Sequence, residues 1–210
     1  MPERTSHPPA TISWIDLATS DQAAAKDFYA ALFGWEYEDM PAGEGVVYSM
    51  AKHRGRSAAA ISPQQEHEAA QGIPPHWNVY VTVEDVEATA GKVADAGGQV
   101  LAAPFDVFDA GRMAVIADPS GGALCLWQPG TNIGAEIVNE PGTISWTDLE
   151  TTDQEGAKAF YGGLFGWEYE DMPAGEGVVY SMAKHRGRSA AAISPQQADE
   201  AAQGLSLIHI

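Results

Sequence analysis

Two short phrases of the sequence place a carboxylate two residues after a tryptophan. The first phrase contains Trp14 and Asp16, and the second contains Trp146 and Asp148. Residues two apart in a strand share a face, so each phrase sets an aromatic ring beside a carboxylate. A carboxylate on a ligand-facing surface can act as a general base, and Asp16 is therefore the predicted catalytic residue. The alternative is a structural carboxylate that hydrogen-bonds the backbone or a neighbouring arginine.

Cys125 and His76 are the other side chains that could carry chemistry. Cys125 is the only cysteine of the chain, and no motif links it to a base, so a buried inert thiol competes with a nucleophile. His76 precedes an expected strand, where it either reaches a binding site or lies on the surface. No two histidines have metal-site spacing, and no phosphate loop, nucleophile elbow or dinucleotide fingerprint occurs.

Alternation along two further expected strands predicts the remaining residues of a binding surface. In segments 78–83 and 123–127, valines and leucines alternate with polar and aromatic residues, so the second set faces away from the helices. Such a surface suits a small, partly aromatic molecule, although the same aromatics could simply fill the core. The predicted ligand-binding residues are Trp14, Asn78, Tyr80, Cys125 and Trp127.

The candidate carboxylates belong to a strand, helix and hairpin phrase that the chain uses twice. The phrase that begins at Thr11 begins again at Thr143, and residues 32–65 are identical to residues 164–197. Surface positions tolerate change, so identity over both surface and core indicates a recent duplication or a join in the sequence. Internal repeats of this kind mean that the fold is built from repeated units.

Each unit reads as one strand, one helix and three strands. In the first, a strand over 12–17 precedes a helix capped by Ser20 or Asp21, which Gly34 ends in the left-handed conformation. The fold class is therefore α+β, with tandem βαβββ modules. The expected organisation is a flexible arm (1–9), a domain of two modules (10–130), a linker (131–142), a third module that is half of a second domain (143–204) and an atypical tail (205–210).

Composition excludes several classes of partner. The net charge of −18 argues against binding nucleic acid, which needs clustered basic residues. The basic cluster 52–56 reads as a hairpin turn, with an anion site as the alternative. No apolar run approaches the ~20 residues of a membrane span. A single cysteine fits a reducing compartment, so a cytoplasmic protein is expected.

The chain resembles the vicinal oxygen chelate superfamily, which includes glyoxalase I, bleomycin-resistance proteins and extradiol dioxygenases. The resemblance rests on DFYAALFGW (Asp27 to Trp35) and ADPSGGALCLWQPG (Ala117 to Gly130), and it extends over residues 10–204. The double-length layout is most similar to an actinobacterial glyoxalase-like or hydroxylase-like branch. The resemblance implies that paired curved sheets form a cup around a ligand. In the family's enzymes, residues of the first and final strands hold a divalent metal in this cup.

The residues at the family's metal positions differ from its usual His, Gln and Glu. These positions fall on Trp14, Asn78 and Cys125, and the third module repeats the tryptophan as Trp146. Tryptophan has no lone pair for a metal and an amide is a poor ligand beside histidine. We therefore predict no metal or other cofactor. A divalent metal held by an atypical set, such as Asp16 with His76, is the alternative.

The resulting hypothesis is a small-molecule-binding protein without the family's usual metal site, which acts by binding a ligand or by an unassigned reaction. The alternative is a metal-dependent lyase, isomerase or dioxygenase, so the sequence leaves open whether the protein is an enzyme. A structural protein with no ligand is a third class. Because the third module lacks a partner module, its apolar face predicts association into a homodimer.

Overall fold

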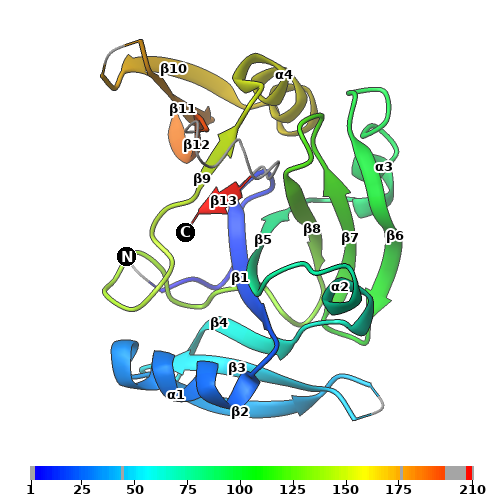
Figure 1. The fold of residues 1–210 in the computed structure, drawn as a ribbon, viewed down its shortest axis with the longest axis vertical. Helices are drawn as coiled ribbons and strands as arrows, with labels where there is room; N and C mark the ends of the chain where they lie inside the picture. The colour runs from blue at the N-terminus through cyan, green and yellow to red at the C-terminus, as the bar shows by residue number, and fades with distance from the viewer. Residues whose placement is uncertain (1–2, 44, 176, 197–206, 210) are drawn as a thin grey trace. The chain divides into compact units, whose positions relative to one another are not determined.

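The three predicted βαβββ modules are present in the structure, a computed structural model that describes residues 3–43, 45–175, 177–196 and 207–209 (Figure 1). The chain divides into two compact units. The first unit contains the described residues of 1–6, 13–79 and 133–145, and the second contains those of 7–12, 80–132 and 146–210. Each compact unit is described separately below.

The first compact unit holds the first module and the start of the strand that opens the second. Its elements are β1 (Ile12–Thr19), α1 (Gln22–Phe33), β2 (Glu36–Pro41), β3 (Val47–His53), β4 (Arg56–Pro63), α2 (Glu66–Ala70) and β5 (His76–Thr82). The strands lie in the order β2-β3-β4-β1, in which β1 is parallel to β4 and the other neighbours are antiparallel. The first residue of β1 and the last three of β5 belong to the second compact unit.

The second compact unit holds the second and third modules. Its further elements are α3 (Val86–Ala90), β6 (Gln99–Val107), β7 (Gly111–Ala117), β8 (Ala123–Pro129), β9 (Asp148–Thr151), α4 (Gln154–Phe165), β10 (Glu168–Pro173), β11 (Val179–His185), β12 (Arg188–Pro195) and β13 (Leu207–His209). One set of strands follows the order β5-β8-β7-β6 and the other β10-β11-β12-β9-β13. Among the described residues, no helix is long and apolar enough to cross a membrane.

The first long helix begins and ends as the sequence predicts, and the second has Asp153 as its N-cap where a capping box of Thr152 and Glu155 is the sequence expectation. Asp21 caps α1 by accepting a hydrogen bond from the Ala24 amide, and Gly34 ends it with φ of 69°. The same chemistry recurs in α4, where Asp153 accepts from a backbone amide and Gly166 has φ of 68°. A cap residue satisfies an amide that the first turn leaves unpaired, and glycine enters the left-handed region without a Cβ clash.

Two elements are shorter than their counterparts in the first module, α1 and β1. The apolar stripe after Asp85 forms only five residues of α3 before the chain turns, and β9 has four residues where its counterpart β1 has eight. Within the predicted tail, Leu207–His209 form β13, which pairs antiparallel with β9. The remaining tail residues lie outside the described part of the chain.

The third module has a partner surface inside the second compact unit, contrary to the expectation that it would be unpartnered. Phe160 of α4 is 1% exposed. The Tyr161 hydroxyl donates to Asp118 Oδ2 at 3.0 Å, and Thr151 Oγ1 donates to Ser120 Oγ at 2.8 Å. Helix and strand residues of the third module therefore pack on the DPSGG turn of the second. The predicted homodimer itself stays a prediction.

Each compact unit also includes a short segment that precedes the first strand of the other repeat copy. In the first unit, Trp35 Nε1 donates to the Gly142 carbonyl at 2.8 Å, and in the second, Trp167 Nε1 donates to the Ala10 carbonyl at 2.9 Å. Gly142 and Ala10 are counterparts and share positive φ values of 80° and 62°. The compact units therefore differ from the predicted boundaries of 10–130 and 143–204.

Candidate functional site

Asp16, the predicted catalytic residue, lies near the centre of β1 in the first compact unit. It is 3% exposed. Asp16 Oδ1 accepts from Asn78 Nδ2 and Oδ2 accepts from the Tyr48 hydroxyl, both at 2.9 Å. A buried carboxyl group without donors would be strongly unfavourable, and these two hydrogen bonds supply a donor to each of its oxygens.

Trp14 joins the same group through Tyr48. Its indole Nε1 donates to Tyr48 Oη at 2.8 Å, so the hydroxyl accepts from the indole and donates to Asp16. Both roles of one hydroxyl are thereby used. Trp14, Asp16, Tyr48 and Asn78 form what we call the Asp16 cluster. Trp14 and Asp16 are buried, whereas Tyr48 and Asn78 are half-buried.

Tyr48 was not predicted from the sequence, although a signal for it exists. The hairpin turn after His53 sets the pairing of β3 and β4, in which Met50 lies opposite Ala60. Ala60 in turn lies opposite Asp16 on β1. Since residues two apart share a face, Tyr48 is on the same face as Met50. The turn gives the pairing next to His53, but the register shift between Ala51 and Lys52 and the parallel register between β4 and β1 cannot be read from the sequence.

The third module contains a second version of this group in the second compact unit. Trp146 Nε1 donates to Asp148 Oδ1 at 2.7 Å and to Tyr180 Oη at 2.9 Å, and the Tyr180 hydroxyl donates to Asp148 Oδ1 at 2.6 Å. Burial, reinforced by the hydrogen bond to Asp148, raises the pKa of Tyr180 to about 12. We call these three residues the Asp148 cluster.

The two clusters differ in burial and in one partner. Asp16 is buried, whereas Asp148 is half-buried. The counterpart of Asn78 is Ile210 in the sequence, and its placement lies outside the described residues. An isoleucine cannot donate a hydrogen bond. The chain therefore carries an internal comparison for the role of the Asn78 amide.

The other predicted ligand-binding residues meet in the second compact unit. Tyr80 lies opposite Cys125 on the parallel strands β5 and β8, and the Tyr80 and Trp127 rings meet edge to face at 6.4 Å. All three are buried, and Trp127 Nε1 donates to the Asn132 carbonyl at 3.0 Å. A Cβ at Gly111 would lie 2.7 Å from the Trp127 ring, so this ring packs on backbone. Their predicted ligand contact stays a prediction.

The residues at the family's metal positions do not fit a metal ion. The Trp14 indole nitrogen is a donor whose hydrogen is directed at Tyr48, and it has no lone pair to offer. His76 lies instead beside Pro74 and Glu68, with Nδ1 2.9 Å from the Pro74 carbonyl and Nε2 4.0 Å from Glu68 Oε1. Among the described residues, no group of three or more His, Cys, Asp and Glu side chains could hold a metal ion. The alternative that Asp16 and His76 hold a metal ion stays a prediction.

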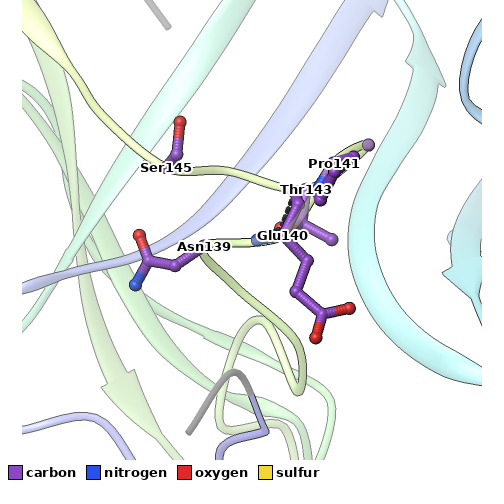
Figure 2. A pocket seen from close by; sticks show the side chains of 6 residues that line it. Asn139, Glu140, Pro141, Thr143 and Ser145 are labelled. Carbon is purple, nitrogen blue, oxygen red and sulfur yellow. Dashed lines mark hydrogen bonds between the residues drawn. The ribbon is translucent and has the colours of Figure 1, made fainter.

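An open surface hollow of about 530 Å³ follows the linker in the first compact unit (Figure 2). Asn139, Glu140 and Ser145 are among the residues around it, and the Glu140 carboxylate is paired with Arg54 at 2.6 Å. The Thr143 hydroxyl donates to the Glu140 carbonyl at 2.8 Å. These contacts fold the linker turn, and none of the predicted site residues lines the hollow.

Comparison with known proteins agrees with this architecture. A family model, the Glyoxalase/Bleomycin resistance protein/Dioxygenase superfamily, matches residues 11–126. "Putative glyoxylase CFP32" of Mycobacterium tuberculosis is 46% identical over 185 residues, which are 88% of this chain and 70% of that protein. "Anthracycline biosynthesis protein DauV" of Streptomyces sp. is 36% identical over 77% of this chain and 62% of its own length.

Solved structures show the same fold at low sequence identity. The Mn(II)-bound glyoxalase from Novosphingobium aromaticivorans has a TM-score of 0.62 and 17% identity, over 89% of this chain and 62% of that one. A mutant of 4-hydroxymandelate synthase from Streptomyces coelicolor has a TM-score of 0.61 and 15% identity, over 90% and 63%. The α+β fold of βαβββ modules and the resemblance noted in the sequence are confirmed. This chain belongs to the glyoxalase/bleomycin resistance protein/dioxygenase superfamily.

Proposed function

We propose that the chain is a small-molecule-binding member of this superfamily, and that the Asp16 cluster anchors the ligand without a metal ion. The observation that carries the proposal is the hydrogen bonding of Asp16. The buried carboxylate accepts hydrogen bonds from Tyr48 and Asn78, and the resemblance gives Trp14 and Asn78 of the same cluster as positions of metal ligands in the family's enzymes. A pre-formed polar group beside an aromatic ring is the usual arrangement of a small-molecule site.

Half-buried Asn78 and buried Trp14 define the class of ligand in this proposal. The Asn78 amide has a carbonyl acceptor and a second N–H that the bond to Asp16 does not use, and the Trp14 ring supplies an aromatic surface. A small aromatic molecule with hydroxyl or keto groups matches both features. The name of the Streptomyces relative, an anthracycline biosynthesis protein, supports a role in the chemistry of small organic molecules.

The proposal extends to the setting of the protein. The formal charge of −18 supports a partner that is a small molecule rather than nucleic acid. A cytoplasmic location and a homodimer are part of the proposal, and cell fractionation and light scattering test them. Asp16 is the residue to test if a reaction accompanies binding.

A ligand screen on metal-free protein tests the function. The protein is treated with EDTA, checked by elemental analysis, and heated with a panel of aromatic hydroxy and keto compounds. A compound that binds only the native state raises the apparent stability, by about 2.7 kcal/mol at a hundred times its Kd. Several matching compounds are expected to raise the Tm.

The opposite outcome is equally specific. Stoichiometric Zn, Ni, Mn or Fe that EDTA removes together with an activity would establish the metal-dependent lyase, isomerase or dioxygenase instead. If no compound changes the Tm in either preparation, the ligand-binding proposal is wrong.

A further inference from the structure

Two helices that share seven of their twelve residues have opposite surroundings. Phe28 and Tyr29 of α1 correspond to Phe160 and Tyr161 of α4. Phe160 is 1% exposed, whereas Phe28 is 59% exposed. None of the α1 residues is buried, while Ala157 and three aromatic residues of α4 are. The helix sequence therefore does not determine whether these side chains are buried. Their burial depends on the surface that covers α4.

The cover of α4 is a specific surface of the second module. A Cβ at Gly98 would lie 2.5 Å from Phe160 Cε2, so only a glycine lets the ring approach this backbone. Asp118 accepts the Tyr161 hydroxyl at 3.0 Å, and its other oxygen accepts the amides of Ser120 and Gly122. The surface thus combines a glycine seat for the phenylalanine with a fixed carboxylate for the tyrosine.

The corresponding groups around α1 have no such cover among the described residues. The Tyr29 ring contacts Trp35 and Trp77, but no described residue hydrogen-bonds its hydroxyl. Leu32 is 57% exposed on the same helix. Phe28, Tyr29 and Leu32 form what we call the α1 face, in which Phe28 and Leu32 are exposed and Tyr29 is half-buried. Phe28 and Tyr29 are the counterparts of the two α4 residues that contact the second module. Clustered exposed apolar side chains mark interaction surfaces.

We propose that the α1 face is a docking surface for a further βαβββ module of the second-module type. The partner is defined by its chemistry: a glycine in the place of Gly98 and an acidic turn in the place of 118–122. Phe28 would enter the glycine seat, and the Tyr29 hydroxyl would donate to the carboxylate, which makes a charge-assisted hydrogen bond. A second copy of this chain does not fit, because its own α4 already covers the surface that carries Gly98 and Asp118.

The test attaches such a module at the position where the repeated sequence would continue into a copy of the second module. The chain is produced as residues 1–204 followed directly by a copy of residues 73–130, and is compared with the original chain by hydrogen exchange. Docking should slow the exchange of the α1 amides by on the order of tenfold or more. The matched control is the same extension carrying Gly98→Leu and Asp118→Ala in the added copy only, and it should leave α1 at the original rate.

Each other outcome overturns the proposal. An extension that leaves α1 exchanging at the original rate, whether or not it protects its own amides, shows that this module does not dock there. Equal protection by the control extension shows that the glycine seat and the carboxylate are not recognised. If light scattering finds that the original chain dimerises and that the dimer protects α1, the occupant is a second copy.

Discussion

At the scale of single residues, the Tyr48 hydroxyl connects the two polar side chains of the β1 site. It links Trp14 to Asp16 by two hydrogen bonds, and the same three residue types recur as Trp146, Asp148 and Tyr180. The tyrosine-to-aspartate and tryptophan-to-tyrosine hydrogen bonds recur in the second compact unit, where the hairpin and the parallel strand pairing recur as well. The copies differ in the burial of the aspartate, in the hydrogen bond from Trp146 to Asp148 and in Asn78, and we propose that the copy with Asn78 anchors the ligand.

Tyr180 gives a pH-dependent prediction for the Asp148 cluster. Its folded-state pKa is raised to about 12, above the roughly 10 of an unfolded tyrosine. The stabilisation is therefore fully present below pH 10 and is lost as the pH rises through 12, because the unfolded state ionises first. Denaturant unfolding of the wild type should weaken more steeply over this window than that of Tyr180→Phe. Equal slopes, or a difference spectrum of the two proteins that titrates near pH 10, would contradict the assignment.

At the scale of elements, comparison of α1 with α4 shows which helix properties depend on local sequence and which depend on the surrounding elements. The caps, length and left-handed ends of α1 and α4 agree because they depend on local residues such as Asp21 and Gly34. The burial of the two helices disagrees because it depends on the glycine at position 98, which belongs to another module. No periodicity within the helix could have revealed this difference.

A matched pair of truncations measures that difference. Phe160→Ala removes a ring that is 1% exposed and should cost about 3–5 kcal/mol of unfolding free energy, as core Phe→Ala changes do. Phe28→Ala removes a ring that is 59% exposed, and should change stability by roughly 0.5 kcal/mol or less. Urea denaturation of both variants gives the comparison. Similar losses for the two would mean that α1 is covered in the same way as α4.

Two adjacent glycines of α4 provide a second element-scale prediction. A Cβ at Gly163 would meet no atom within 4 Å, whereas one at Gly162 would lie 3.2 Å from the Trp167 carbonyl oxygen. Alanine is favoured over glycine within a helix by about 1 kcal/mol, so Gly163→Ala should raise the unfolding free energy by roughly that amount. Gly162→Ala should gain less because of its close contact. Thermal unfolding of both variants checks the order, and a larger gain at Gly162 would contradict it.

At the scale of the whole molecule, the order of elements could be predicted from the sequence but their grouping could not. Alternation, caps and turn residues are local, and they gave the three βαβββ modules and the shared face of Trp14 and Asp16. The compact units depend instead on contacts between distant segments, such as Trp35 with Gly142 and Trp167 with Ala10. Each tryptophan is a recognisable part of the repeated phrase, but its acceptor is a backbone carbonyl with no sequence signature.

The candidate site was predictable to a similar extent. Alternation placed Asp16 and Asn78 on ligand-facing strand positions, and the structure joins them by a hydrogen bond. Alternation could not identify Tyr48. Its place beside Asp16 depends on the pairing of β4 with both β1 and β3. Alternation also gave no sign that His76 lies beside Glu68 of α2, because this is a contact between separate elements.

Calorimetric titration tests most directly whether Asp16 anchors a ligand without a metal ion. The compound with the largest thermal shift is titrated into EDTA-treated wild type, Asp16→Asn and Asp148→Asn. The account predicts one site per chain with equal Kd in the wild type and Asp148→Asn, and at least about tenfold weaker binding in Asp16→Asn, since a hydrogen bond to a charged group contributes about 1.5–3 kcal/mol. Binding that requires an added metal ion, or a Kd that Asp16→Asn leaves unchanged, would contradict it.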